Sequence, residues 1–456
     1  MKPTNWPSLK MANIFIKRDG ESMKYHIKTF GCQMNVNETE IMSGILEKEG
    51  WQWTENPSES DFIIINTCSV REKAENKMYS AIGNYAKIKK RNKNLKLAVC
   101  GCSAEKEKEK ILSRFNEVDF VFGTRNIVDI SNLYKKSLVE KRFIDFTDKL
   151  ELMSYQTTKK PFSKHHAWIT IIHGCNKYCT YCIVPYTRGL EKSRNFDDLI
   201  KEAEIYAKKG FKEITLLGQN VDSYGKDFGD GKPKLDKLIE NISKIEGIER
   251  IWFTTSYPTD ITDELIETVA KNEKAAKFFH LPVQSGSNKI LKEMNRKYTR
   301  EYFLDLVKKI KEKIPDVTIT TDLILGFPSE TDLDFEDTLD LVKKCRFEKI
   351  NVAEYSPREG TIAYKYKRDD IPKEMKNKRL QKILDTQKEI NREENEKYLN
   401  KILEVVQESK VKSGEYLGRT SNNKVVIFPA EEKNLGKKVN IEIHRISAGP
   451  LYGIIV

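Results

Sequence analysis

The sequence contains no run of the roughly 20 apolar residues that a membrane-spanning helix requires. Its N-terminus also lacks the apolar core of a secretory signal peptide, because the apolar stretch at residues 11–16 is short and interrupted. No internal repeat and no low-complexity tract is present, which argues against a repeat array. We therefore expect a cytoplasmic protein without a membrane partner.

Cysteine is sparse, with 8 residues in 456. In the reducing cytoplasm these thiols are not expected to form structural disulfides, so clustered cysteines indicate metal or redox chemistry. The hydrophobic fraction of 39% excludes a mostly disordered chain, and the length suggests two or three domains. A total of 80 Lys and Arg against 68 Asp and Glu leaves a formal charge of +12, which suits a polyanion such as RNA but equally describes a lysine-rich solvated surface.

Strands and helices alternate over residues 24–145, after an N-terminal extension at residues 1–23 to which no function is assigned. Short apolar strands are expected at 24–30, 61–66, 95–100 and 119–122, with helices at 36–50, 69–91 and 105–115. This alternation is typical of a doubly wound α/β domain built on a parallel sheet.

After a polar connection at 145–166 the alternation resumes from Ala167 to about Pro357, within a second domain expected at 160–392 that includes a helical linker. Six strands are expected at 168–172, 213–217, 250–254, 278–283, 317–325 and 349–355, which favours a partial, open (β/α)6 barrel over the closed eightfold form. The highly charged stretch at about 371–401 is expected to be mostly solvated helix joining domains. Residues 393–456 predict a small β-barrel, so the fold class is multidomain α/β.

The strongest local signal is the loop Gly174–Cys182, in which Cys175, Cys179 and Cys182 follow the first barrel strand. Thiolates at this spacing can bind three irons of a cubane cluster and leave the fourth iron open for a ligand. Zinc is the structural alternative, but a structural zinc site with three thiolates needs a fourth protein ligand, and His173 is poorly placed to supply it.

Three further cysteines, Cys32, Cys68 and Cys102, each follow a strand of the N-terminal domain. Ligands of doubly wound sheets bind outside the carboxyl ends of the strands, so these thiols are expected to converge on a second cluster with an open iron. The alternative is three unrelated buried cysteines. Cys100 ends a strand and Cys345 lies on a helix, and both are expected to be packed in a core, although Cys100 would compete as a ligand if its strand ended early.

Polar residues follow the later barrel strands as well. The carboxyl face of such barrels carries the active site, so these residues are candidates for cofactor contact, although a turn or a helix cap is an equally good account of each. They are Gln219, Asn220, Ser256, Gln284 and Ser285.

The three-cysteine loop on a partial barrel resembles the radical S-adenosylmethionine (SAM) superfamily, in which the open iron chelates the methionine moiety of SAM. Tyr181 matches the aromatic position of that motif, near the adenine. From about Tyr25 onward the chain also resembles the MiaB-type methylthiotransferases. The matching segments are 29–35, 66–74, 101–102, 174–194, 216–220, 281–287 and 326–331, with 418–420 and 423–426 matching the RNA-binding TRAM domain of that family.

The resemblance implies that a methylthio group is installed at C2 of an N6-isopentenylated adenosine at tRNA position 37. It implies two [4Fe-4S] clusters, with the one on Cys32, Cys68 and Cys102 as the auxiliary cluster. SAM would serve both as methyl donor and as radical source, and an external electron donor would be needed. Alternative substrates are an aspartate of a ribosomal protein and threonylcarbamoyl-adenosine; a rival of another class is a non-catalytic cluster carrier or RNA-binding scaffold.

RNA affinity is expected from the C-terminal barrel. Candidate phosphate contacts are Arg419, Lys424, Lys437, Lys438 and Arg445. Tyr416 and Phe428 are candidates for base stacking, although an aromatic residue in an alternating strand is more often core. The expected partner is thus tRNA, and a monomer is expected.

Overall fold

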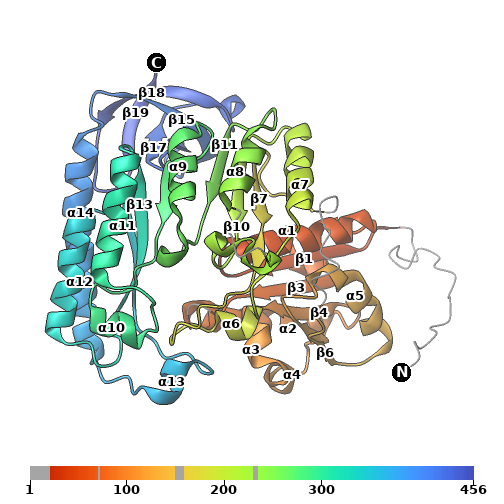
Figure 1. The fold of residues 1–456 in the computed structure, drawn as a ribbon. Helices are drawn as coiled ribbons and strands as arrows, with labels where there is room; N and C mark the ends of the chain where they lie inside the picture. Colours follow the sequence, from red (N-terminus) through yellow and green to blue (C-terminus); the bar gives the residue numbers. More distant parts are fainter. Residues whose placement is uncertain (1–20, 70–71, 149–158, 230–234) are drawn as a thin grey trace. The chain divides into compact units, whose positions relative to one another are not determined.

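The computed structural model describes residues 21–69, 72–148, 159–229 and 235–456. Most of the expected N-terminal extension, the residues Val70 and Arg71 of one family motif, and the middle of the connection at 145–166 lie outside these ranges. The chain divides into two compact units, Met1–Lys160 and Pro161–Val456, which are described separately (Figure 1). In the described part, no helix is both long enough and apolar enough to cross a bilayer.

The first unit is built on a six-stranded, entirely parallel sheet in the order β2-β1-β3-β4-β5-β6. The central strand β3 is buried on both faces because every residue of its sequence FIIINT lies in the interior. The strands are β1 (Lys24–Thr29), β2 (Gln52–Trp53), β3 (Phe62–Thr67), β4 (Lys96–Gly101), β5 (Phe120–Phe122) and β6 (Phe143–Asp145).

Helices cover both faces of this sheet, as a doubly wound domain requires. One apolar cluster joins one face to α1 (Gln33–Lys48) and α5 (Ile130–Val139). A second cluster joins the other face to α2 (Glu72–Arg91), α3 (Cys102–Glu107) and α4 (Glu109–Arg114). The single helix expected at 105–115 is two helices, because Lys108 adopts a φ of +42° and interrupts it.

The second unit contains the six expected barrel strands in two parallel sheets. One sheet has the order β11-β10-β7 and the other β12-β13-β14. A hydrogen bond from Ser256 N to His280 O (3.1 Å) links them, and no pairing of β7 with β14 closes the ring among the described strands, so the barrel is partial and open as expected. The strands are β7 (His166–Thr170), β10 (Glu213–Leu217), β11 (Arg250–Phe253), β12 (Phe278–His280), β13 (Thr318–Leu325) and β14 (Lys349–Glu354).

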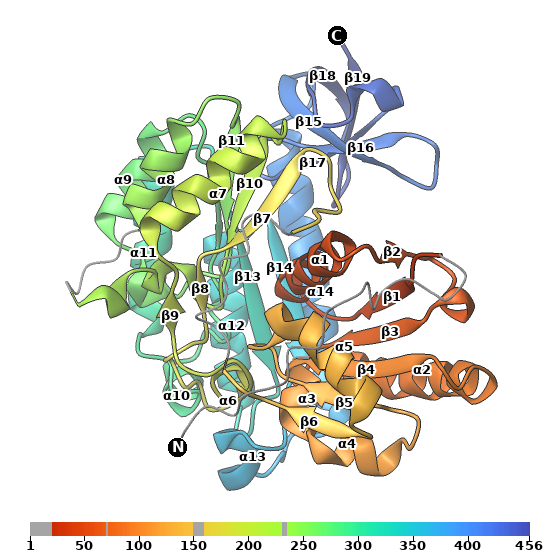
Figure 2. The ribbon, with the colours of Figure 1, turned by 90° about the vertical axis from the view of Figure 1, so that its right-hand side faces the viewer.

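Amphipathic helices form the outer layer of this barrel (Figure 2). They are α7 (Phe196–Lys208), α8 (Leu235–Ser243), α9 (Asp263–Lys271), α11 (Arg300–Lys313) and α12 (Asp332–Cys345). The charged segment expected to be mostly solvated is α14 (Lys373–Glu396). This expectation holds for only one face, because Ile383 and Ile390 are buried and α14 packs against β14 and α12.

The C-terminal strands form a closed barrel in the order β15-β16-β17-β19-β18. It packs against the amino ends of the large barrel's strands: Arg250, the first residue of β11, donates to Arg419 O (3.2 Å), and Lys277 N donates to Ser421 O (2.9 Å). The carboxyl ends of the strands therefore lie on the opposite face. The five strands are β15 (Ile402–Lys410), β16 (Tyr416–Arg419), β17 (Val425–Phe428), β18 (Lys438–Arg445) and β19 (Leu451–Ile455).

Candidate metal centres

Three thiols of the first unit lie at the carboxyl ends of three adjacent parallel strands. Cys32 follows β1 and precedes α1, Cys68 directly follows β3, and Cys102 begins α3 directly after β4. Since β1 pairs with β3 and β3 with β4, the three positions share one edge of the sheet. Cys32 is exposed, whereas Cys68 and Cys102 are almost fully buried.

Glycines allow these strand ends to approach closely. A Cβ added to Gly31 would lie 2.6 Å from the Cβ of Cys68, and a Cβ added to Gly101 would lie 2.2 Å from the carbonyl oxygen of Thr67. Gly101 also has a φ of +91° and a ψ of −172°, a region that only glycine readily adopts. The loops that carry Cys32, Cys68 and Cys102 are therefore packed directly against one another.

A buried amide pair fixes the first turn of α1 to β3. Asn35 Nδ2 donates to Asn66 Oδ1 and to the carbonyl oxygen of Thr67 (both 3.0 Å), and Asn66 Nδ2 donates to Asn35 O (2.9 Å). Cys32 contacts Asn35 through its backbone N–H and its thiol, each 3.4 Å from Asn35 Oδ1. The Asn35–Asn66 pair thus places two of the cysteine loops relative to each other.

Two hydroxyls beside these thiols are buried without a hydrogen-bond partner in the described part of the chain. They belong to Ser69, which follows Cys68, and Ser103, which follows Cys102. Buried donors are nearly always paired, so these two fit an acceptor that is not part of the polypeptide, such as the sulfur atoms of a cluster. The residues at this edge are compatible with an iron–sulfur cluster.

Cys100 and Cys345 lie in apolar cores, as the sequence predicts. Cys100 is fully buried within β4 and packs in the cluster that contains α1 and α5, and burial raises the pKa of its thiol well above the usual range. Cys345 is buried at the end of α12, where burial raises the thiol pKa to about 12. Both thiols are therefore packed among apolar side chains, as expected of core cysteines.

The three-cysteine loop of the large barrel is held by backbone contacts on both sides. Gly174 N donates to Gln219 Oε1 (2.7 Å) after β10, and Cys175 N donates to Gly189 O (3.1 Å). Further along the loop, Thr180 N donates to Met294 O (3.0 Å). The loop therefore has a defined conformation at the carboxyl end of β7.

The thiols of this loop lie within electrostatic reach of one another in a mostly buried setting. Burial raises the pKa of Cys175 to about 11 and that of Cys182 to about 12, and Cys179 adds to both shifts. Thiolates here need positive charge nearby. Among the described residues, no three His, Cys, Asp or Glu side chains are placed to bind one metal ion together. A cubane cluster does not require this, because each of its three thiolates binds a different iron.

Arg296 supplies positive charge at this loop. Its side chain is 8% exposed and donates to Cys179 Sγ (3.4 Å), Tyr298 Oη (2.7 Å) and Pro282 O (2.5 Å). Among the described residues it forms no ion pair with a carboxylate. Burial lowers its pKa, but Tyr298, Tyr181, Cys179 and Tyr257 together raise that pKa well above the usual value. A buried guanidinium without a carboxylate fits an anionic partner, and a cubane with three thiolate ligands carries net negative charge.

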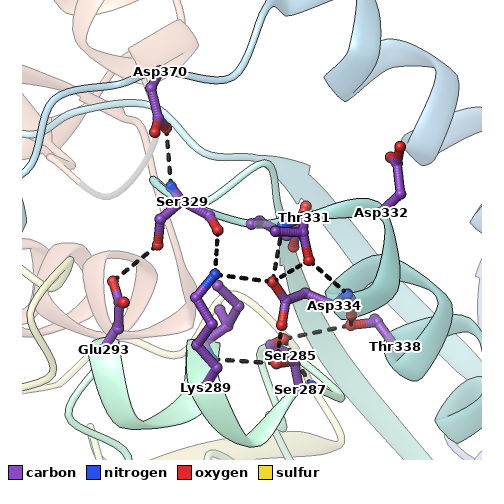
Figure 3. A network of polar contacts seen from close by, with 12 residues as sticks. Ser285, Ser287, Lys289, Glu293, Ser329, Thr331, Asp332, Asp334, Thr338 and Asp370 are labelled. Carbon is purple, nitrogen blue, oxygen red and sulfur yellow. Dashed lines mark hydrogen bonds and ion pairs between the residues drawn. The ribbon is translucent and has the colours of Figure 1, made fainter.

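The polar residues predicted to contact the cofactor differ in their surroundings. Asn220 and Ser256 are buried and engaged: Asn220 donates to Asp260 (2.6 Å) and Ser256 to Asp222 (3.2 Å). Ser285 lies 3.4 Å from Thr338 Oγ1 within a network that joins α10 (Asn288–Glu293) to α12 (Figure 3). These three side chains already have structural hydrogen bonds.

The other three candidates are Gln219, Tyr181 and Gln284. Gln219 anchors Gly174, and the Tyr181 hydroxyl accepts from Arg296 Nη1 (3.5 Å). Gln284 has a φ of +75° at the carboxyl end of β12, an unusual conformation for a residue with a Cβ. Of the predicted set, Tyr181 thus lies in the cysteine loop, and Gln219 contacts it directly.

A buried carboxylate that sequence reasoning missed ties the loop to the barrel. Asp260 accepts from Lys177 (2.8 Å) in the cysteine loop and from Lys226 (2.7 Å). Burial would raise the pKa of Asp260, but these two lysines hold it below the usual value. Neighbouring Asp222 forms no hydrogen bond or ion pair with a lysine among the described residues, and burial raises its pKa to about 7. In the sequence, Asp260 is an acidic residue a few positions beyond the end of a strand. Spacing alone does not distinguish such a residue from an ordinary turn residue.

Of the residues of the C-terminal barrel that were predicted to contact RNA, some are exposed and others are buried. Arg419 and Lys438 are partly exposed, with carboxylate partners Glu408 and Glu404 at 3.1 Å each. The prediction for Lys424 fails: its ammonium is buried and pairs with Glu348, so it is not presented to solvent. Tyr416 and Phe428 are buried core residues, and neither is available as a stacking platform.

A cysteine loop after the first strand of an open parallel barrel, beside a buried guanidinium with no carboxylate partner among the described residues, is the arrangement expected of a radical SAM enzyme. Comparison with protein families agrees, matching the Radical SAM superfamily at residues 169–342, the uncharacterized protein family UPF0004 at 24–123 and the TRAM domain at 396–456. The chain belongs to the family of tRNA-2-methylthio-N(6)-dimethylallyladenosine synthases, the MiaB-type methylthiotransferases. Enzymes of this kind insert sulfur and use SAM and [4Fe-4S] clusters.

Relatives support this membership over nearly the whole chain. The tRNA-2-methylthio-N(6)-dimethylallyladenosine synthase of Petrotoga mobilis is 65% identical over 95% of this chain and 99% of its own length. The enzyme of the same name from Pseudothermotoga lettingae is 52% identical over 94% and 98%. Among solved structures, the radical SAM methyltransferase TsrM of Kitasatospora setae aligns with a TM-score of 0.52 at 11% identity over 73% of each chain, a likeness of fold alone.

Proposed function

We propose that this chain transfers a methylthio group to C2 of an N6-dimethylallyl adenosine at position 37 of tRNA. The observation that carries the proposal is that each unit presents three thiols at the carboxyl end of parallel strands, a number that leaves one iron of a four-iron cluster open for a non-protein ligand. The proposed ligands are Cys175, Cys179 and Cys182 for the radical cluster and Cys32, Cys68 and Cys102 for the auxiliary cluster.

When bound, the clusters and SAM supply the electron, the radical and the sulfur chemistry. The chain's own residues bind and orient. Lys177 and Asp260 hold the cysteine loop against the barrel, and Gln219 fixes its first residue. Arg296 places a positive charge beside Cys179 in a site that excludes most water, where electrostatic stabilisation of an anion is strongest.

RNA binding by the C-terminal barrel is part of the proposal, through Arg419 and Lys438 at its surface. Their substitution tests this better than removal of residues 402–456, because Arg250 and Lys424 connect this barrel to the large one through buried contacts. In R419Q/K438Q we expect weaker tRNA binding and a salt slope reduced by up to about 1.8 for two phosphate contacts. An unchanged slope contradicts this role. We further propose that the protein works as a cytoplasmic monomer with an external electron donor.

Nucleoside mass spectrometry of tRNA tests the substrate. A strain lacking the gene should accumulate the N6-dimethylallyl nucleoside without its 2-methylthio derivative, and the wild-type gene should restore the derivative. A C175A/C179A/C182A variant should lose both reductive SAM cleavage and product, whereas C32A/C68A/C102A should keep SAM cleavage and lose product. Unmodified tRNA in the complemented strain, together with a modified ribosomal protein or threonylcarbamoyl-adenosine, would refute the proposed substrate. Absence of SAM cleavage by the reconstituted wild type would favour a non-catalytic scaffold.

A further inference from the structure

A short helix beside the cysteine loop carries an exposed group of aromatic and basic side chains. Helix α13 (Ile362–Tyr366) and the residues after it read IAYKYKR, in which tyrosines alternate with cations. Tyr364 is 50% exposed and Tyr366 81% exposed, and Lys365 and Arg368 are exposed as well. These four residues are called the α13 face.

The α13 face is attached directly to the cysteine loop. Ala363 N donates to Thr180 O (2.7 Å), and Thr180 lies between Cys179 and Cys182. Ala363 itself is buried in an apolar cluster with Met294, against which Tyr181 packs. Contacts with the loop therefore fix the inner side of α13, and the tyrosines project from its outer side.

The far end of the segment is also anchored. Lys367 pairs with Glu293 of α10 (2.5 Å), and Ser329 Oγ donates to the same carboxylate (3.2 Å). Asp370 accepts from Ser329 N (2.9 Å), a contact visible in Figure 3. Since both ends are held, the face keeps a fixed position relative to the cysteines.

The charged side chains of this segment differ in their partners. The carboxylate of Asp369 accepts from Lys376 Nζ (2.6 and 2.8 Å), and that of Asp370 accepts from a backbone N–H. Lys365 and Arg368 form no ion pair with any residue in the described part of the chain, whereas Lys367 does. Lys365 and Arg368 are thus exposed cations without a carboxylate partner in the described part of the chain, whereas the carboxylates of Asp369 and Asp370 are held by hydrogen bonds.

A second exposed aromatic pair lies on the cysteine loop and the short helix after it. Tyr178 is 39% exposed and Tyr186 of α6 (Val184–Arg188) is 50% exposed, with their rings in an edge-to-face arrangement 6.3 Å apart. A Cβ added to Gly360, just before α13, would lie 3.3 Å from Ile183, which precedes α6. Figures 1 and 2 both show α6 and α13 at the same end of this unit.

We propose that the α13 face, with Tyr178 and Tyr186, binds the unpaired nucleotides that flank the modified adenosine of the tRNA. This rests on the proposed function. A base that receives chemistry must leave its stack, and its neighbours then lose stacking partners. Exposed aromatic rings supply those partners, and adjacent Lys and Arg contact the phosphates between them, which is how proteins generally recognise single-stranded RNA loops.

The test uses the full-length reconstituted protein and a fluorescent tRNA anticodon stem-loop that carries N6-dimethylallyl adenosine. In Y364A/Y366A we expect the dissociation constant to rise about tenfold or more for each lost base stack, while Y364F/Y366F keeps most of the affinity. In K365Q/R368Q we expect the slope of log affinity against log salt to fall by about 1.4, for two phosphate contacts on a single strand. Iron content per chain and the far-ultraviolet circular dichroism spectrum identify misfolded variants. If the alanine pair misfolds, the K365Q/R368Q variant still decides the question.

Matched controls lie on the outer helices of the barrel. Lys308 on α11 and Lys344 on α12 are exposed cations that, unlike Lys365 and Arg368, have carboxylate partners, and Tyr302 on α11 is a 42% exposed tyrosine. The K308Q/K344Q and Y302A variants should bind the stem-loop like the wild type. If α13 variants also bind like the wild type, the inference is overturned and the surface serves a protein contact instead.

Product formation separates this inference from the proposed function. If the wild-type enzyme forms the methylthio product and the α13 variants bind the RNA normally, the RNA-binding role of the α13 face is refuted and the proposed function is not. A wild type that forms no product on this RNA, but whose binding still depends on Tyr364 and Tyr366, refutes the proposed reaction and supports the face.

Discussion

Substitution of Gly101 by alanine should disrupt the auxiliary site through two separable effects. The first is strain, because Gly101 has a φ of +91° and a ψ of −172°. Such a conformation costs a residue with a Cβ on the order of 1–3 kcal/mol. The second is crowding, because the new Cβ would lie 2.2 Å from Thr67 O and 2.6 Å from Thr67 N. Both are backbone atoms, which cannot move without shifting β3, and overpacking of this kind costs about 1–3 kcal/mol. Together the two effects predict about 2–6 kcal/mol.

Gly50 provides a matched control in the same unit. Its φ is also +91°, but a Cβ there would meet nothing within 4 Å. The G50A variant should therefore be destabilised only by the left-handed conformation, by about 1–2 kcal/mol. The comparison isolates what the close packing of β3 and β4 contributes.

Two measurements on the full-length chain check this prediction. Hydrogen exchange followed by mass spectrometry on peptides of β3 and β4 gives the local opening free energy, which should fall more in G101A than in G50A. Iron analysis in a C175A/C179A/C182A background, where only the auxiliary site can load, should give about four iron atoms per chain for G50A and far fewer for G101A. Equal stability and equal iron in the two variants would show that the close approach of the strand ends does not position Cys68 and Cys102.

Three further changes test other parts of the structure. Burial raises the pKa of Asp222 to about 7 from an ordinary value of 3.8, so the stability linked to its proton is present below pH 4 and lost as pH rises through 7. D222N should therefore be more stable than wild type at pH 8, by at most about 4 kcal/mol, and equal to it near pH 4; a constant difference across urea titrations would exclude this linkage. Lys424→Met leaves the Glu348 carboxylate without its cation and should cost about 3–5 kcal/mol, whereas K438Q at the surface should cost under about 1 kcal/mol by thermal unfolding. Arg296→Met removes the donor to Cys179 and a buried positive charge, so the midpoint potential of the cluster on Cys175, Cys179 and Cys182 should become more negative. Redox titrations followed by electron paramagnetic resonance measure this potential, and Arg296→Lys should give a value between those of the wild type and Arg296→Met. An unchanged potential would count against the electrostatic role.

The sequence was sufficient for features that depend on local periodicity. Each of the six barrel strands is present, and β10 has the expected bounds, because buried strands of a parallel sheet are short apolar runs with polar ends. The same logic brought Cys32, Cys68 and Cys102 to one sheet edge and left Cys100 in the pleat. The predictions that failed concern side chains whose burial depends on residues far away in the sequence. Lys424 has the local pattern of a surface cation, and its buried position depends on Glu348, 76 positions away, and on Asn395.

Arg296 shows the same limit from the opposite side. It lies 117 positions from Cys179, in a stretch rich in other cations, and nothing in its local pattern distinguishes it from a solvated arginine. Its importance comes from the surrounding rings: it stacks near Tyr257 (4.4 Å from the ring centroid) and contacts Tyr298. Asp260 was missed for a similar reason, since the lysines that it binds come from two separate loops.

The attachment of the small barrel to the amino ends of the strands has a consequence for the dimensions of a substrate. Thr318, which donates to Asn422 O of the small barrel, is the first residue of β13, and Leu325 is the last. Eight residues of strand extend about 26 Å, so one molecule that reaches both the small barrel and the cysteine face must span that length. The large barrel thus sets a minimum length of about 26 Å for a molecule bound at both ends, and a single nucleoside is too short to reach it.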